Sequence, residues 1–271
     1  MNAIYKSSLV LGWCILLLQG CTVNLKLTDN SAPFVRADLE ADYELSRFGG
    51  EKQGLAPTPP QVKASGKDIQ GIGLRVRGKF SNNFFWTNPE GSSETTIATP
   101  WGTIGEKEEL TANGWGYWGR LLVMPGLTLW GDRIFFAGVT GLSGLYMHLP
   151  VYRKSTSTLA LGESDAGTFG ITLGGHLEWT IARTIAPSCT ITWTPDLAHS
   201  GNPWLSKNSV WTTELGVRLW PGSLIPTVGD HLWIEAGYTW LSLNTAAITG
   251  LINETTHIDM NGPSAGFGFR F

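Results

Sequence analysis

A histidine and a serine stand next to each other at His199 and Ser200, and the carboxylates of Asp196 and Glu214 lie nearby in the sequence. A serine beside a general base and an orienting acid is the arrangement that acyl hydrolases use to activate a nucleophile. Neighbouring residues on a strand point to opposite faces, however, which would separate the pair. The run His-Ser-Gly-Asn-Pro is also an ordinary loop composition. The competing interpretations are therefore a hydrolytic site and a plain loop.

A second pattern with chemical potential is the alternation of charged and apolar residues. Arg75, Arg77 and Lys79 occupy every second position of one segment, so a strand would place them on one face. Buried charges need partners of opposite charge. We predict a charge network inside a closed sheet, with these members: Arg75, Arg77, Lys79, Arg120, Glu178, Glu214, Arg218, Glu235 and Arg270, with His176 nearby. Such a network is either a salt-bridged plug or a gated path for protons or ions.

The remaining composition argues against other chemistries. The five histidines and three cysteines are scattered without the spacing of metal ligands, so we expect no metal and no cofactor. The formal net charge of -3 gives no support to nucleic-acid binding.

The N-terminus has the pattern of a processing signal. Lys6 precedes an apolar stretch from Leu9 to Leu18, which is too short to span a membrane as a helix and suits a secretory signal. The stretch ends in Leu18-Gln19-Gly20-Cys21, which resembles the lipobox of bacterial lipoproteins. The resemblance implies cleavage before Cys21, a lipid on its sulfur and, with Thr22 following, release to the outer membrane. The alternative is an ordinary signal peptide that ends at a chance cysteine.

The elements that position these residues are strands. Charged residues make up only 15% of the chain, against about 25% in ordinary globular domains, and there are 13 tryptophans. Alternating polar and apolar residues predict strands over eight segments, near residues 69–80, 115–124, 133–146, 168–181, 189–194, 211–219, 232–240 and 263–271. Several tryptophans fall near the ends of these segments, where membrane barrels carry aromatic girdles.

The last segment sets Phe267, Phe269 and Phe271 on one face, opposite Gly268 and Arg270. It resembles the C-terminal strand of bacterial outer-membrane proteins, in which a terminal Phe is part of the assembly signal. The chain as a whole resembles small barrels of the OmpA and OmpX type. The resemblance implies an all-β fold, an eight-stranded antiparallel transmembrane up-and-down β-barrel with an N-terminal extension. It also implies two kinds of partner: outer-membrane lipids and, through Phe271, the barrel-assembly machinery.

Connection lengths predict the orientation of such a barrel. Long loops near 81–113, 147–167, 195–208 and 242–259 would alternate with short turns. Counting back from a periplasmic Phe271 places residue 69 at the periplasmic end, with Cys21 tethered at that same end. The predicted organisation is a signal peptide over 1–20, a lipidated extension and linker over 21–67, and the barrel over 68–271.

The N-terminal extension leaves one element undecided. Residues 34–47 alternate as a strand does, yet Ser31 could cap a helix that Gly49 and Gly50 would end. The Pro-rich run 56–60 reads as a linker. A ninth strand at 34–47 would disturb the even strand count, so we expect this segment in the periplasm or at the barrel mouth.

Three functions follow as hypotheses, and the surface ligand stays open in all of them. The first is a non-enzymatic outer-membrane barrel lipoprotein with a structural or surface-interaction role through its loops. The second is a lipid-A-modifying acyl hydrolase or acyltransferase, similar to the PagL and PagP families, that would use His199, Ser200 and Glu214. PagL-like enzymes separate His and Ser by one residue, and this chain does not. The third is a lipid-tethered periplasmic binding protein.

Overall fold

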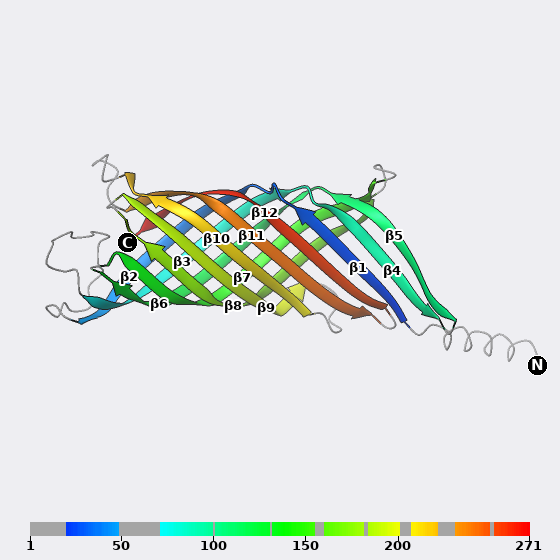
Figure 1. The fold of residues 1–271 in the computed structure, drawn as a ribbon, viewed down its shortest axis with the longest axis horizontal. Coiled ribbons are helices and arrows are strands. Elements are labelled where there is room, and N and C mark those ends of the chain that lie inside the picture. The colour runs from blue at the N-terminus through cyan, green and yellow to red at the C-terminus, as the bar shows by residue number, and fades with distance from the viewer. Residues whose placement is uncertain are drawn as a thin grey trace, which may run out of the picture.

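The described part of the chain is almost entirely β-structure, so the all-β prediction is confirmed (Figure 1). The computed structural model describes residues 20–48, 71–99, 101–130, 132–154, 160–181, 184–200, 207–221, 231–249 and 252–271. The strands are β1 (Gly20–Asp29), β2 (Phe34–Phe48), β3 (Ile72–Thr87), β4 (Glu90–Thr99), β5 (Gly102–Ala112), β6 (Gly114–Leu129), β7 (Ile134–Arg153), β8 (Ala160–Trp179), β9 (Ile185–Ser200), β10 (Lys207–Leu219), β11 (Leu232–Thr249) and β12 (Ile252–Arg270). The predicted signal peptide, except Gly20, and the Pro-rich run lie outside the described residues.

The strands belong to a single sheet, which closes on itself. Its order is β1-β4-β5-β7-β6-β3-β2-β12-β11-β10-β9-β8, and β8 also pairs with β7. The latter contact joins the two ends of the series β7-β6-β3-β2-β12-β11-β10-β9-β8, which makes a barrel.

Three pairs of strands continue one another around this ring. β1 and β2 both lie along β12, at residues 252–260 and 264–270 respectively. In the same way β4 and β3 lie along β1 and β2, and β5 and β6 lie along β4 and β3. Each of these pairs therefore occupies one position, and the described strands fill nine positions around the barrel. Directions can alternate around a ring only if the number of positions is even, so the contact of β12 with β1 and β2 is parallel.

Two corners interrupt the long strands at prolines. Pro33 separates β1 from β2, and Pro89 separates β3 from β4, each lacking the N–H that a ladder needs. Opposite the first corner, a Cβ added to Gly262 would lie 1.9 Å from the carbonyl oxygen of Ala32. Only glycine therefore allows β12 to pass the corner at this distance.

Asp29 fastens the two corners together. Its Oδ1 accepts hydrogen bonds from the backbone N–H and the hydroxyl of Ser31, at 2.8 and 2.9 Å. Its Oδ2 accepts from the hydroxyl of Thr87 and the backbone N–H of Asn88, at 2.7 and 2.8 Å. Burial by itself would raise the pKa of this carboxyl, but the four hydrogen bonds favour the charged form and leave the pKa lowered.

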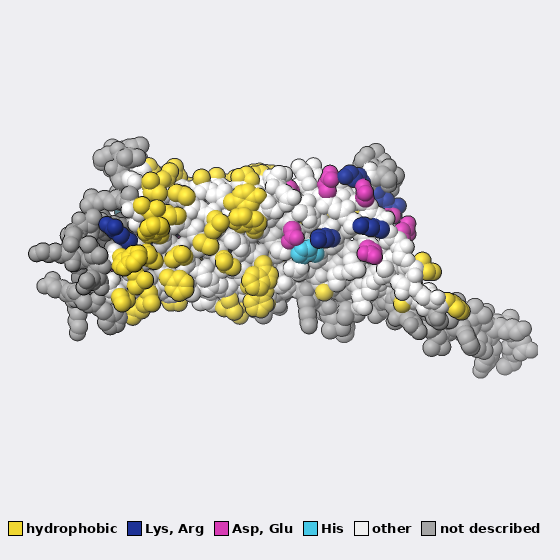
Figure 2. Space-filling model, in the orientation of Figure 1, with side chains coloured by type: hydrophobic (Ala, Val, Ile, Leu, Met, Phe, Trp, Pro, Cys, Tyr) yellow, Lys and Arg dark blue, Asp and Glu magenta, His cyan; other side chains and the backbone are white. Residues whose placement is uncertain are grey.

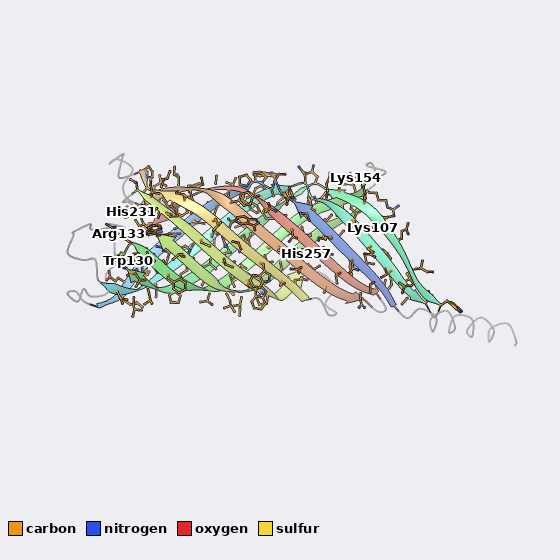
Figure 3. All side chains as sticks on the ribbon, viewed as in Figure 1. Lys107, Trp130, Arg133, Lys154, His231 and His257 are labelled. Carbon is orange, nitrogen blue, oxygen red and sulfur yellow. The ribbon has the colours of Figure 1, made fainter. Side chains whose placement is uncertain are left out.

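The outer surface of the barrel is divided into two halves (Figure 2). Large apolar side chains cover the half that ends at the C-terminus, and we call this surface the apolar belt. It includes Val35, Leu39, Tyr43, Phe80, Leu121, Val123, Phe136, Leu142, Ile171, Leu173, Leu177, Ile191, Leu215, Val217, Ile234, Phe267 and Phe269. The other half consists of β1, β4, β5 and the adjoining ends of β7–β12. It is called the extension from here on, and it is not the N-terminal extension that the sequence predicted. Lys107, Lys154 and His257 lie on it, whereas Trp130, Arg133 and His231 mark the opposite end (Figure 3).

The interior reverses this polarity. Inside the extension lies an apolar core that contains Leu27, Phe34, Phe85, Leu110, Trp118, Leu145, Met147, Leu149, Leu241, Leu243, Ile258 and Met260. Inside the apolar belt the interior carries charged side chains. A layer of hydroxyl groups, Ser143, Thr172 and Thr194, joined at 2.8–3.0 Å, also lies in the interior. The extension thus has an apolar core, as a β-protein in water does. The belt half has an apolar surface, and its interior holds charged groups beside a smaller apolar cluster on β6 and β7.

Three predictions about the barrel are wrong. The sheet is mixed and not an eight-stranded antiparallel barrel, because β1 and β2 supply a ninth position. Residues 20–48 therefore form part of the barrel wall and not a separate extension or a structure at its mouth. Cys21 pairs with Ile252, at the end of the barrel opposite to Phe271, because β1 runs parallel to β12.

The four long loops of the prediction are corrected too. Residues 90–99 and 102–112 form β4 and β5, and the other three predicted loops are largely continuations of β7 to β12. Their side chains alternate as well, but with the apolar side facing inward, as at Met147, Leu149, Leu243 and Ile258.

Candidate functional site

The described interior of the belt half holds the main concentration of functional groups. β2 contributes a row that the sequence analysis did not include, Arg36, Asp38, Glu40 and Asp42, all at most 5% exposed. They occupy every second position of the strand, so all four point inward. The alternation of these four residues is visible in the sequence. They are not assigned to the predicted network because the segment also suits a helix.

Glu40 lies at the centre of the network. Its Oε2 accepts a hydrogen bond from Arg270 Nη2 at 2.7 Å, and its Oε1 lies 3.0 Å from Arg218 Nη1. Arg218 Nη1 also donates to Glu178 Oε2, which is 2.9 Å from Arg77 Nη1 as well. Side chains from β2, β3, β8, β10 and β12 thereby meet across the interior.

Further ion pairs surround this centre. Arg77 Nε lies 2.7 Å from Asp42 Oδ1, and Lys79 Nζ lies 2.7 Å from Asp38 Oδ2. A second group is formed by Glu214 with Arg36, at 3.0 Å, and Arg120, while Arg218 Nε binds Glu235 at 2.7 Å. Arg75 lies nearer the rim, 3.4 Å from Asp132. All nine members predicted for the network point inward, and the structure joins each of them to at least one partner.

The ion pairs described above join equal numbers of basic and acidic side chains. Among the described residues, seven basic side chains, Arg36, Arg75, Arg77, Lys79, Arg120, Arg218 and Arg270, face seven acidic ones, Asp38, Glu40, Asp42, Asp132, Glu178, Glu214 and Glu235. Aromatic rings cover several guanidinium groups, with Arg120 Cζ 3.7 Å from the Trp118 ring centroid and Arg218 Cζ 4.4 Å from that of Trp233. Pairing with opposite charges is the condition under which buried ions are tolerated.

His176 borders this network. Its Nδ1 is 2.8 Å from the Thr190 hydroxyl, and its Nε2 is 3.9 Å from Glu178 Oε2. Phe135 packs against the ring, with 5.9 Å between centroids. The histidine is therefore held on three sides, which is the geometry of a packed interior group.

The structure does not bring the candidate hydrolytic residues together. His199 and Ser200 lie near the end of β9, opposite Thr168 and Gly167 of β8. Glu214 pairs with Thr190 of β9. Thr190 precedes His199 by nine residues, so Glu214 and His199 are about 30 Å apart along the strand. Glu214 is also committed to Arg36 and Arg120 in the interior.

The described residues contain no group of three or more His, Cys, Asp and Glu side chains that could hold a metal ion. No helix in the described part of the chain is long and apolar enough to cross a membrane. No protein-family model, curated protein or solved structure matches the chain. Any statement of function therefore depends on the polarity of the barrel and the chemistry of its surfaces.

Proposed function

We propose that this protein is a non-enzymatic β-barrel of the bacterial outer membrane, with a plugged lumen and an extension that serves a structural or surface-interaction role. The observation that carries the proposal is the reversal of polarity between the two halves. A closed sheet with apolar side chains outside and paired charges inside suits lipid surroundings. The reverse arrangement in the extension suits water.

The dimensions of the apolar belt support this proposal. On β2 the outward apolar residues run from Val35 to Leu45. Ten residues of strand rise about 33 Å, which a tilt of about 40° reduces to about 25 Å of height. That value matches the apolar band of outer-membrane barrels. Trp86, Trp115, Trp211 and Trp240, all exposed, lie toward the extension side of the belt, where an aromatic girdle would meet the membrane surface.

The filled interior argues for a plug and against an open channel. Paired charges fill the described interior of the belt half, and aromatic rings cover several of its guanidinium groups. We therefore assign the network to holding nine strand positions together. The barrel would anchor the extension, which would present its polar surface outside the membrane.

This fold bears on whether Cys21 carries a lipid. Fourteen residues separate Cys21 from Val35, which corresponds to about 35 Å of height at the same tilt. Acyl chains on Cys21 would therefore stand far above the membrane that holds the belt. The fold favours the alternative of an ordinary signal peptide, and the intact mass of the protein purified from membranes distinguishes the two mature N-termini.

A gel-mobility experiment on membranes tests the proposal. The protein in an outer-membrane fraction, washed with alkaline carbonate, should remain with the membranes and migrate differently in unboiled and boiled samples, because a folded barrel resists detergent. Release by carbonate with no heat-dependent shift would support the tethered periplasmic protein instead. Altered lipid A acylation between cells with and without the protein would support the enzyme.

A further inference from the structure

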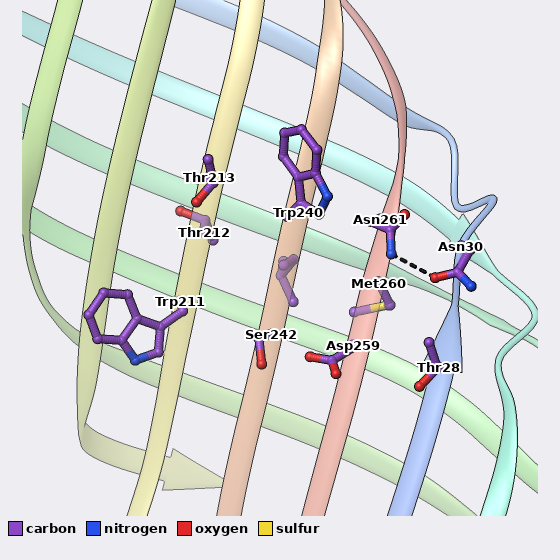
Figure 4. A pocket seen from close by; sticks show the side chains of 11 residues that line it. Thr28, Asn30, Trp211, Thr212, Thr213, Trp240, Ser242, Asp259, Met260 and Asn261 are labelled. Carbon is purple, nitrogen blue, oxygen red and sulfur yellow. Dashed lines mark hydrogen bonds between the residues drawn. The ribbon is translucent and has the colours of Figure 1, made fainter.

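A hollow of about 380 Å³ opens on the outer surface of the barrel, across β10, β11, β12 and β1 (Figure 4). Strand register places its outward side chains in two rows. In the first row Trp211 pairs with Ser242, Ser242 with Asp259, and Asp259 with Thr28. In the second row Thr213 pairs with Trp240 and Trp240 with Asn261, next to Asn30.

The hollow lies at the boundary between the belt and the extension. On the belt side of it the same strands carry outward Leu215, Ile234 and Phe267. On the extension side they carry polar groups such as Asn244 and His257, which are hydrogen-bonded to each other. A molecule in this hollow would therefore contact apolar surface at one end and polar surface at the other.

Neighbouring side chains hold the two aromatic walls in place. Trp211, half exposed, has its ring centroid 6.0 Å from that of Trp193. Trp240 is 39% exposed, and its ring centroid lies 4.5 Å from that of Tyr238. The walls therefore offer flat apolar faces that are already ordered before a ligand arrives.

The polar groups between these walls are fixed as well. Asp259 Oδ2 lies 2.7 Å from His257 Nε2. Asn261 donates to Asn30 Oδ1 at 2.8 Å and accepts from the Tyr238 hydroxyl at 2.6 Å. Carboxylate, amide and hydroxyl groups are thus arranged on one surface at fixed spacing, as selective hydrogen bonding to a ligand requires.

The charge of the lining selects among headgroups. Among the described residues, those that line the hollow include one acid, Asp259, and no Lys or Arg. An anionic phosphate would meet the carboxylate without a basic partner. A sugar ring suits the lining better, because its C–H faces pack on aromatic rings and its hydroxyls bond to Asp, Asn, Ser and Thr.

We propose that this hollow binds the saccharide headgroup of a glycolipid in the outer leaflet, with Trp211 and Trp240 against the sugar faces and Asp259 and Asn261 bonding its hydroxyls. The lipid source rests on the proposed function, because it requires the belt to lie in a membrane. The acyl chains would then run over Leu215, Ile234 and Phe267 of the belt.

Native mass spectrometry of the folded full chain tests this proposal. The protein in micelles is offered equal amounts of diglucosyl diacylglycerol, phosphatidylcholine and phosphatidylglycerol, and the retained lipid is counted. The expected result is preferential retention of the glycolipid. Trp240→Leu and Asp259→Asn should each weaken retention by about tenfold or more, because each removes one principal contact. Trp86→Leu, at an exposed tryptophan on β3 outside the hollow, is the matched control and should leave retention unchanged.

Several results would overturn the proposal. Equal retention of the three lipids would do so, and so would preference for phosphatidylcholine, which would indicate a cation site between the tryptophans. If Trp86→Leu lost as much glycolipid retention as Trp240→Leu, the retention would be due to the aromatic girdle in general and not to the hollow. If free maltose bound as tightly as the glycolipid, the ligand would be a soluble sugar and not a lipid.

The outcome is independent of the gel-mobility test. A barrel that stays in membranes but shows no glycolipid preference keeps the proposed function and loses this site. A protein that carbonate releases, without a heat-dependent shift, loses the proposed function whatever it binds. Heat-dependent mobility of each variant confirms that Trp240→Leu and Asp259→Asn are folded before their retention is compared.

Discussion

Among single residues, Glu40 is expected to contribute most to the stability of the interior network, because it contacts several positive charges. Arg218 and Arg270 lie within 3.0 Å of its carboxylate oxygens, and Lys79 Nζ is 3.7 Å away. Glu40→Gln keeps the volume and removes the charge, which takes one buried counterion from Arg218 and Arg270 and leaves the network with one negative charge fewer. We expect a loss of about 3–5 kcal/mol in the free energy of unfolding.

Urea unfolding of the refolded protein in micelles, followed by gel mobility, measures this loss. Glu94→Gln is the control, since Glu94 is an exposed carboxylate on β4, and its effect should stay within about 0.5 kcal/mol. Equal stability of the two variants would show that the network does not hold the barrel together.

The stability that Asp29 contributes is expected to depend on pH. Its pKa is lowered in the folded protein by hydrogen bonds from Thr87, Asn88 and Ser31, which outweigh the opposite effect of burial. A lowered folded pKa gives a contribution to stability that is complete above the unfolded value, about 3.9. It is lost as pH falls through the folded value. The wild type should therefore exceed Asp29→Asn in stability at pH 7 by more than it does at pH 3.

Thermal unfolding of the two proteins at both pH values measures this difference. A gap between wild type and Asp29→Asn that is the same at pH 7 and pH 3 would contradict the assignment. Asp29 is suited to this experiment because it lies at the corner of β1, outside the apolar belt.

At the scale of elements, the corner between β1 and β2 decides how the barrel closes. Gly262 on β12 faces the carbonyl oxygen of Ala32 so closely that an added Cβ would lie 1.9 Å from it. Gly262→Ala must push β12 away from the corner at the parallel seam. We expect a loss of more than about 1–3 kcal/mol, the usual range for overpacking, because the obstacle is backbone and cannot rotate away.

A matched control is available on β7. A Cβ added at Gly138 would have no atom of a described residue within 4 Å, so Gly138→Ala should change stability by less than about 0.5 kcal/mol. The yield of heat-modifiable barrel on refolding and its urea midpoint compare the two variants. If both alanine variants behave alike, the corner is not a tight contact.

The elements also mark how far the sequence could predict this fold. Alternation correctly predicted strands and the inward direction of residues such as Arg77 and Arg218, because a period of two survives in any sheet. It could not predict the nine positions, since β1 begins inside the signal-like segment and β2 also suited a helix. It could not predict the extension either. The run from Leu241 to Leu243 alternates in the same period as the belt, and only its surroundings decide which face is inside.

At the scale of the whole molecule, the first two described strands both pair with the last strand. β1 and β2 run parallel to β12, so Cys21 and Phe271 lie at opposite ends of the barrel. Figure 1 shows β1 on the side of the barrel away from the labelled C-terminus. If the C-terminus faces the periplasm, as in the proposed function, the extension must project from the cell. The extension would then account for a surface role, because charged groups such as Lys107 and Lys154 lie on it (Figure 3).

This orientation is tested by epitopes at the two ends. One tag is inserted in the turn between β4 and β5, beside Trp101, which is 83% exposed at the far end of the extension. The other is inserted between β6 and β7, beside Trp130, which has a positive φ of 54° in a turn at the opposite end. Antibody on intact cells should label the first tag and not the second, and both should be labelled after the outer membrane is made permeable. Labelling of the second tag alone on intact cells would invert the barrel and place the extension in the periplasm, while labelling of both would indicate a protein that does not span the membrane as proposed.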